Sequence, residues 1–116
     1  MLHQMMATQL ELQRTTFGID PARLEPDARA TFFQEMTLGA TDELHEALAH
    51  VGWKGWAMSR HFERDACATE LVDALTFIMG LLLACGWNAD DVYKAYMEKA
   101  SINARRQVEG HSGVRS

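Results

Sequence analysis

The sequence contains no strand-like pattern, and this constrains its fold more than any other feature. β-Branched residues never alternate with polar residues over the length of a strand, and the 116 residues include only eight Gly and two Pro. This pattern predicts an all-α fold. The chain, 47% hydrophobic, is long enough to fold as one domain spanning residues 1–116 without disulfides or a structural metal. We expect fraying at both ends, over residues 1–8 and 111–116.

Turn signals divide the chain into four predicted helices, at about residues 2–16, 27–51, 60–85 and 89–109. The signals are Gly18-Ile19-Asp20-Pro21, Gly52 to Gly55, Gly86-Trp87-Asn88 and Gly110. Asn88 precedes two acidic residues and is predicted to cap the fourth helix, and Ser59 is predicted to cap the third.

The charge balance argues against broad binding to nucleic acid. Sixteen acidic and eleven basic residues give a net charge of −5, which repels a phosphate backbone. The first residues lack a signal-peptide pattern, and the longest uncharged run, 74–87, is shorter than a membrane span. Cys67 and Cys85 are predicted to be reduced, partly buried thiols. We therefore expect a cytoplasmic protein that does not bind membranes.

Apolar residues recur at helical spacing in the second and third predicted helices. These stripes are predicted to form the core, and they consist of Leu44, Leu48 and Val51 in one helix and Leu71, Leu75, Ile78 and Leu82 in the other. The run 78–83 is apolar around nearly the whole helix, more than one thin bundle covers. We therefore expect a homo-oligomer, either a homodimer or a homotetramer.

Two carboxylate pairs with three-residue spacing lie beside these stripes, Glu43 with Glu46 and Glu70 with Asp73. On adjacent antiparallel helices the four carboxylates can converge, where they would raise one another's pKa unless cations neutralise them. Such oxygen ligands suit Mg²⁺, with Mn²⁺ as a substitute. The alternative is that these acids form ordinary solvated helix faces.

The fourth predicted helix carries a polar stripe at positions i, i+3, i+7 and i+10. Its members are Tyr96, Lys99, Asn103 and Arg106. Lys and Arg bind phosphate oxygens, and Asn can hold a sugar hydroxyl or a phosphate. The stripe is equally consistent with a solvated basic face near a helix C-terminus.

Four further residues are candidate substrate contacts, and each has a plain structural alternative. Trp53 and Trp56 can cover a nucleotide or pack at a helix corner, and Lys54 between them can reach a phosphate or stay solvated. Phe77, one turn beyond Asp73, can stack on a base or fill the core.

These motifs, in order, resemble the dimeric all-α dUTPases of the MazG-like nucleoside triphosphate pyrophosphohydrolase superfamily. The series is Glu43-Leu-His-Glu46, Trp53-Lys54-Gly55-Trp56, Glu70-Leu-Val-Asp73-Ala-Leu-Thr-Phe77 and Lys99-x-x-x-Asn103-x-x-Arg106-Gln107-x-x-Gly110. The similarity spans about residues 9–111. It implies a four-helix MazG-like bundle and a Mg²⁺-dependent enzyme that cleaves a nucleotide between its α and β phosphates, releasing the monophosphate and pyrophosphate.

The resemblance also implies how the base is held, and here the sequence departs from the family. Leu12-Gln13 matches the start of a family segment that holds uracil, which makes Gln13 a candidate base contact. Phe17 and Thr76 stand near the positions of a family Asn and His. The chain also lacks the long insertion that larger members carry before the last helix. The resemblance therefore implies a minimal form with weaker base selectivity.

These observations predict a dNTP pyrophosphohydrolase that prefers pyrimidines, with dUTP first. Glu43, Glu46, Glu70 and Asp73 are the predicted metal ligands. Glu46 and Glu70 are the predicted catalytic residues, with Glu46 the more plausible one to orient or deprotonate water. The alternatives are a pyrophosphatase for another dNTP, such as dCTP, dTTP or dGTP, and a non-catalytic helical interaction module.

Overall fold

The computed structural model describes residues 1–110 as an all-helical chain, which confirms the all-α prediction. The helices are α1 (Leu2–Thr15), the short 3₁₀ helix η1 (Pro21–Arg23), α2 (Pro26–Ala49), α3 (Arg64–Ala84) and α4 (Ala89–Gly110). An isolated antiparallel bridge between Val51 and Phe62 is the one β pairing within residues 1–110. The predicted fraying of 111–116 lies outside the described residues.

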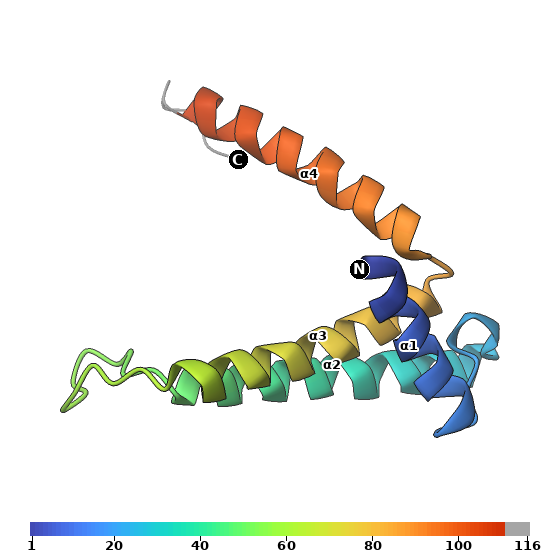
Figure 1. Cartoon of the computed structure of the whole chain (residues 1–116), viewed down its shortest axis with the longest axis horizontal. Coiled ribbons are helices and arrows are strands. Elements are labelled where there is room, and N and C mark those ends of the chain that lie inside the picture. Colours follow the sequence, from blue (N-terminus) through green and yellow to red (C-terminus); the bar gives the residue numbers. More distant parts are fainter. Residues whose placement is uncertain (111–116) are drawn as a thin grey trace.

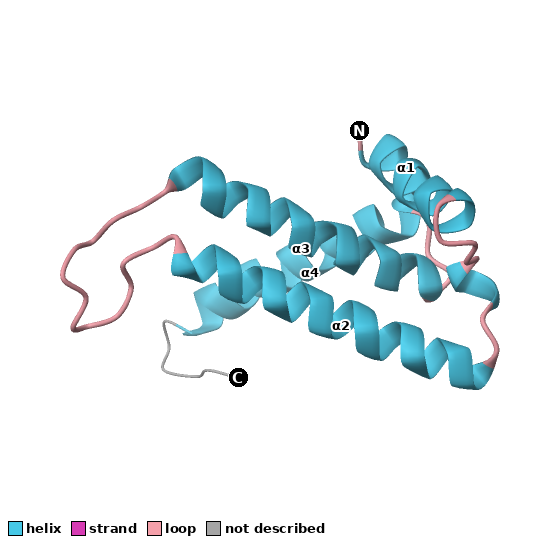
Figure 2. Cartoon of the chain, turned by 90° about the horizontal axis from the view of Figure 1, so that it is seen from below, coloured by secondary structure: helices cyan, strands magenta, loops and turns pink. Residues whose placement is uncertain are grey.

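Helices α2 and α3 form a long antiparallel hairpin, and a loop of residues 50–63 extends beyond its far end (Figures 1 and 2). Small residues line the contact between the two helices, with Ala40, Ala47 and Ala74 buried. At Gly39 an added Cβ would lie 2.6 Å from the Phe77 ring, so only glycine leaves room for this aromatic side chain. The small residues therefore bring the two backbones close together along the face that carries the acidic residues.

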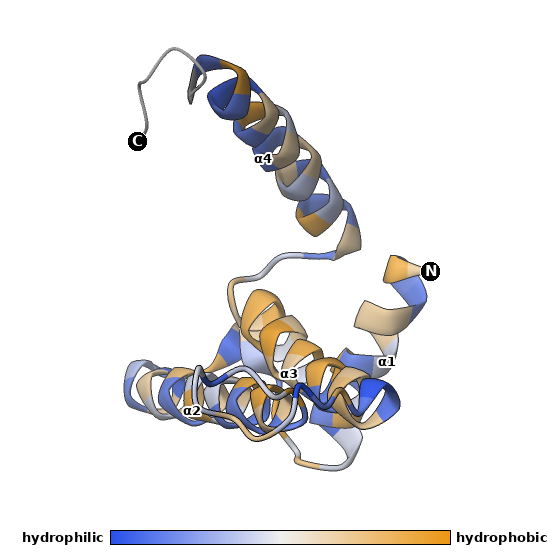
Figure 3. Cartoon of the chain, turned by 90° about the vertical axis from the view of Figure 1, so that its left-hand side faces the viewer, coloured by the Kyte–Doolittle hydropathy of each residue, from blue (hydrophilic) through white to orange (hydrophobic). Residues whose placement is uncertain are grey.

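The prediction that the leucine stripes form the core is wrong for five of their seven members, whereas Leu82 does pack, half-buried, against the core. Leu44, Leu48, Leu71, Leu75 and Ile78 are each between 38% and 49% exposed. These residues stay exposed because α2 and α3 contact each other through the faces that carry their small residues. An apolar surface therefore follows the hairpin, and α3 is its most hydrophobic element (Figure 3).

By length and composition, α3 also meets the criteria for a membrane-spanning helix. Core helices of soluble proteins pass the same test, so the expectation that the chain does not enter a membrane stays a prediction.

A second packing centre lies where α1 crosses the C-terminal half of α3. Its buried members are Met6, Met79, Leu83 and Ala89. Residues 2–8 belong to α1, and Met6 is only 3% exposed, so the prediction that residues 1–8 fray is wrong for this helical part. Burial of Met6 against α3 fixes the start of α1.

Helix α4 projects away from the hairpin, and its main contact with another helix is with α1 (Figures 1 and 3). Gly86, with φ +78°, ends α3 and redirects the chain, and Asn88 then caps α4. The Asn88 side chain accepts from the Asp91 backbone N–H and the Asp91 side chain accepts from the Asn88 backbone N–H, both at 2.9 Å. The predicted Asn88 cap is confirmed, but residues 1–110 of one chain do not close a four-helix bundle.

The third predicted helix begins later than expected, at Arg64 rather than near residue 60. Residues 50–63 instead form a loop with a paired neck, because Gly52 N–H donates to His61 O and Glu63 N–H donates to His50 O, each at 2.9 Å. Glu63 therefore occupies the N-cap position, and the prediction that Ser59 caps this helix is wrong. Of the two thiols, Cys67 is half-buried, whereas Cys85 is exposed rather than partly buried as predicted.

Candidate functional site

Three carboxylates meet across the contact between α2 and α3. One oxygen each from Glu43, Glu46 and Glu70 lies within 4.8 Å of the others. Glu43 and Glu70 are half-buried in the contact, whereas Glu46 is exposed. The structure therefore brings together three of the four predicted metal ligands. Asp73, which is exposed, lies outside this group, which we call the carboxylate cluster.

Within the carboxylate cluster, the pKa values of the two half-buried members, Glu43 and Glu70, shift in opposite directions. The pKa of Glu43 is raised from 4.5 to about 7, first by a hydrogen bond with Glu70, then by burial, and then by the charges of Glu46, Glu70 and Asp73. The pKa of Glu70 is lowered, mainly by the same hydrogen bond with Glu43. The prediction that the acids raise one another's pKa is thus right for Glu43 and wrong for Glu70, because the pair shares one proton.

One oxygen atom of the carboxylate cluster is buried without a hydrogen-bond partner in the described part of the chain. Glu43 Oε2 is buried and, within residues 1–110, accepts no hydrogen bond. Burying a polar oxygen without a partner is unfavourable. Three carboxylates offer the oxygen donors that Mg²⁺ and Mn²⁺ prefer. The residues present therefore fit a divalent cation, which would give this oxygen a partner and offset the negative charge.

The metal-free protein is expected to lose stability as pH rises through about 7. The folded chain holds a proton on Glu43 up to about pH 7 and the unfolded chain only up to 4.5, so this stabilising contribution is complete below 4.5 and lost above about 7. Glu70, whose pKa is lowered, acts in the opposite sense, because its contribution is lost as pH falls. Thermal unfolding in a chelator, on both sides of pH 7, measures the effect.

Glu43→Gln provides the control for this pH dependence, because the amide keeps the shape and does not titrate. The variant should not show the loss near pH 7. If it shows the same loss as the wild type, Glu43 is not the group responsible.

Two of the predicted substrate contacts, Phe77 and Gln13, lie on or beside the side of α3 that carries Glu70 of the carboxylate cluster. Phe77, half-buried in the notch at Gly39, lies one turn beyond Asp73 on α3. Gln13 is 4% exposed, and its Nε2 is 3.7 Å from the position that a Cβ on Gly80 would take. Glu70, Asp73, Phe77 and Gly80 recur at i, i+3, i+7 and i+10, so they follow one side of α3.

A hollow of about 440 Å³ opens between α1 and α3, next to this side of α3. Gln4, Thr8, Gln9 and Thr76 contribute its polar groups, and Met5 and Met79 contribute apolar walls. Sequence reasoning missed Gln9, although its spacing of four residues from Gln13 was a signal that both amides face α3.

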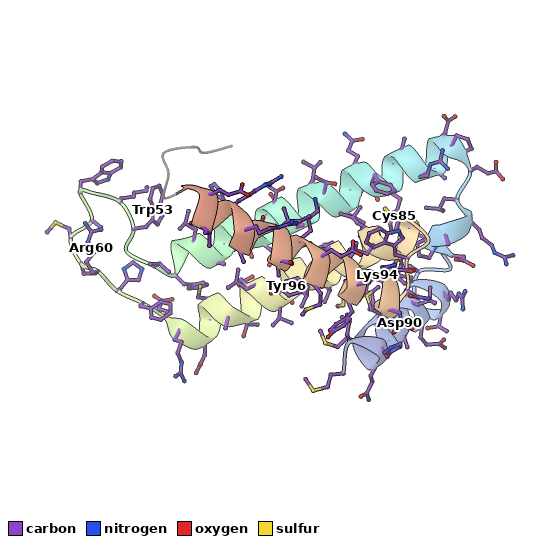
Figure 4. The ribbon with its side chains drawn as sticks, turned by 90° about the horizontal axis from the view of Figure 1, so that it is seen from above. Trp53, Arg60, Cys85, Asp90, Lys94 and Tyr96 are labelled. Atoms are coloured by element: carbon purple, nitrogen blue, oxygen red, sulfur yellow. The ribbon has the colours of Figure 1, made fainter. Side chains whose placement is uncertain are left out.

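The loop residues form a separate group at the far end of the hairpin. Lys54 Nζ lies 5.8 Å from the Trp53 ring centroid and 5.6 Å from the Trp56 ring centroid, so the ammonium is placed between two indoles. Arg60 donates from Nη1 to the carbonyl oxygens of Gly52 and Lys54, each at 2.7 Å, and braces the loop (Figure 4). Sequence reasoning also missed this bracing role of Arg60.

The loop hollow, of about 370 Å³, is lined by Trp53 and Lys54 together with His45 and Leu48 of α2. The carboxylate cluster does not line it. Within residues 1–110, no hydrogen bond or ion pair joins Lys54 to these carboxylates. The structure therefore does not bring the predicted loop contacts together with the acids in one chain.

The polar stripe of α4 is also separate from the carboxylate cluster in the single chain. Tyr96 is 69% exposed, and Lys99, Asn103 and Arg106 are exposed as well. Tyr96 lies on the projecting α4, whereas Trp53 and Arg60 lie on the loop (Figure 4). Within residues 1–110 of one chain this stripe does not meet the acids, because α4 contacts α1 and projects away from the hairpin.

Helical spacing places His50 on the same face as Glu43 and Glu46, which predicts either a group that supports the metal ligands or an ordinary histidine with no role in the site. Glu63 was not predicted to take part. His50 Nδ1 is 2.5 Å from Glu63 Oε2, and His50 Nε2 is 3.9 Å from Glu70 Oε1. The signal was present, since Glu63 precedes Glu70 by seven residues and therefore shares its side of α3.

Models of protein families, curated proteins and solved structures were compared with this chain, and none of them matches it.

Proposed function

We propose that this protein is a Mg²⁺-dependent nucleoside triphosphate pyrophosphohydrolase, with Mn²⁺ as a substitute metal, that converts a dNTP to dNMP and pyrophosphate. The observation that carries the proposal is the carboxylate cluster of Glu43, Glu46 and Glu70, with its buried, unpartnered Glu43 oxygen. Solvated helix-face acids, the plain alternative, would not place a carboxylate oxygen in a helix contact without a hydrogen-bond partner, as Glu43 Oε2 is placed within residues 1–110. The motif order that resembles the MazG-like superfamily supports the same reaction.

The three carboxylates would have different roles, because they differ in how exposed they are. When bound, Mg²⁺ would supply positive charge that offsets the charge of the triphosphate and favours attack by water at phosphorus. Glu43 and Glu70, which are half-buried, would hold the cation. Glu46 is exposed, so it can also orient a water molecule and accept its proton. Asp73 adds negative charge at the rim, which strengthens cation binding without direct contact.

We place the complete site in a homo-oligomer, a dimer or a dimer of dimers. The exposed apolar residues of α2 and α3 give the hairpin a face that a second hairpin can cover, which would complete a four-helix bundle from two chains. In such an assembly α4 of one chain is free to reach the partner. Lys99 and Arg106 would then offset charge on the leaving pyrophosphate, and Asn103 would hold the sugar or the α-phosphate.

The base is expected to lie in the hollow between α1 and α3. The Gln9 amide and the Thr76 hydroxyl are among the polar groups that line it, and the buried Gln13 amide follows one turn further along α1. Phe77, the residue after Thr76, offers an aromatic surface. Amides can pair with the edge of a pyrimidine. Thr76, however, already donates its hydroxyl proton to the Asp73 carbonyl at 2.7 Å. This leaves fewer groups to reject a wrong base, which favours modest selectivity.

A panel of deoxy- and ribonucleoside triphosphates with detection of pyrophosphate tests the proposal. We expect dUTP to be cleaved best, with dCTP and dTTP close behind and discrimination of about ten- to a hundredfold, or ~1.4 to 2.7 kcal/mol. A purine preferred by more than that margin would refute the pyrimidine assignment and leave the metal chemistry in place. Absence of turnover with every triphosphate would refute the enzymatic function.

The second candidate, a non-catalytic helical interaction module, is favoured by the exposed apolar face alone. Thermal unfolding with Mg²⁺ or Mn²⁺ and a non-hydrolysable triphosphate analogue separates the two functions, since a ligand of the folded state raises Tm. The enzyme should be stabilised by the metal and the analogue together. A module with solvated acids should melt unchanged.

A further inference from the structure

The neck of the loop places one histidine between two carboxylates. His50 is the C-cap residue that directly follows α2, and Glu63 is the N-cap residue of α3. Their backbones are joined by a hydrogen bond from Glu63 N–H to His50 O at 2.9 Å. Their side chains are joined as well, with His50 Nδ1 2.5 Å from Glu63 Oε2. The imidazole is therefore fixed twice, through its main chain and through one ring nitrogen.

The other ring nitrogen faces the carboxylate cluster. An ionised carboxylate only accepts hydrogen bonds, and the ring lies between two of them. In the imidazolium form, which carries a proton on both nitrogens, Nδ1–H donates to Glu63 and Nε2–H is turned toward Glu70 Oε1, 3.9 Å away. The His50 and Glu70 side chains are 27% and 24% exposed, so both are held in the contact between α2 and α3. Since the ring is rigid, holding Nδ1 determines where Nε2 points.

We propose that His50, held by Glu63, is a positioning residue that fixes the Glu70 carboxylate within the carboxylate cluster. The inference deepens the proposed function, on which its role in metal binding rests. His50 is not itself within the group of three carboxylates and approaches it through Glu70. Glu70 is drawn to His50 on one side and to Glu43 on the other, so it has little freedom to turn into water. The pair also links the cluster to the loop that carries Trp53 and Lys54.

Mn²⁺ affinity, measured without nucleotide from the electron paramagnetic resonance signal of free Mn²⁺, tests this role in the full chain. His50→Ala should weaken Mn²⁺ binding by about ten- to a hundredfold, as is usual when a group that orients a metal ligand is lost. His50→Gln retains an N–H group near Nε2 and should recover part of the affinity. Glu63→Ala should weaken binding although its side chain is 58% exposed. The double variant with Glu63→Ala and His50→Ala should bind Mn²⁺ little more weakly than His50→Ala alone, because both substitutions remove the same contact between His50 and Glu63.

His45→Ala is the matched control, because His45 is an exposed histidine on α2 that lines the loop hollow and contributes nothing to the carboxylate cluster. It should bind Mn²⁺ as the wild type does. If His50→Ala also binds Mn²⁺ like the wild type while Glu46→Gln does not, the positioning role is wrong and the metal site stands.

A second measurement does not depend on metal. In the metal-free protein, Glu70→Gln should move the ring ¹⁵N resonances of His50, and Asp73→Asn should leave them in place. If Glu70→Gln leaves them unchanged, the positioning role is overturned even in an active enzyme. If the expected shift is seen in a protein that cleaves no triphosphate, the contact stands and the proposed reaction fails.

Discussion

Glu46→Gln should lower kcat/KM for the preferred dNTP by at least about a hundredfold, which corresponds to ~2.7 kcal/mol of barrier. The amide keeps the size of the side chain and removes the negative charge that a cation needs. It also removes the group that can accept a proton from water. Glu46 is exposed, so the fold should be retained. Steady-state kinetics with pyrophosphate detection, together with circular dichroism, checks both parts.

Two further substitutions calibrate this result. Asp73→Asn should lower activity less than Glu46→Gln, because Asp73 lies outside the group of three carboxylates and acts through its charge. Glu35→Gln makes the same chemical change on the same helix, about 12 Å along α2 from Glu43, and should leave activity unchanged. Equal losses in all three variants would mean that net charge matters and that the carboxylate cluster does not bind the metal. Full activity in Glu46→Gln would place the metal elsewhere.

The part of this site that the sequence predicts is the part that helical periodicity determines. Residues three or four apart share a face, so Glu43 with Glu46 and the approach of Glu70 follow from spacing and an antiparallel turn. Periodicity does not say which face of a helix meets its neighbour. The leucine stripes seemed the natural choice, yet the hairpin closes through Gly39 and its alanines, because small residues allow close backbone approach. The acids are consequently drawn into the contact, and the leucines remain exposed.

The features that spacing could not predict depend on how separate elements meet. The direction of α4 is set by the turn at Gly86 and by contact with α1, and neither is visible in the periodicity of α4 itself. The pairing of His50 with Glu63 depends on a loop neck whose hydrogen bonds join residues thirteen apart. Such contacts between elements decide whether Lys99 and Arg106 can serve the carboxylates of their own chain.

Leu75→Glu should convert the proposed oligomer, in which the hairpins would associate through their apolar faces, into a monomer. Leu75 is 38% exposed and belongs to the stripe that Leu71, Ile78 and Leu82 continue, so it is central to that face. Covering a leucine contributes about 1.5–3 kcal/mol, and a two-fold interface would bury the new carboxylate twice without a partner. We therefore expect self-association to weaken by at least about a hundredfold, or ~2.7 kcal/mol. Multi-angle light scattering at micromolar concentration measures it against the 13.1 kDa of one chain.

Val72→Glu is the matched control for Leu75→Glu, because Val72 is 58% exposed on the same helix but one position off the stripe. It should leave the oligomer intact. A monomeric wild type would refute the proposed assembly directly, and dissociation by Val72→Glu alone would move the interface to another face of α3. If α4 completes the site of the partner, monomeric Leu75→Glu should also lose triphosphate hydrolysis while its carboxylate cluster still binds Mn²⁺. Retained hydrolysis by that monomer would instead mean that one chain's carboxylates suffice without Lys99 and Arg106 of a partner.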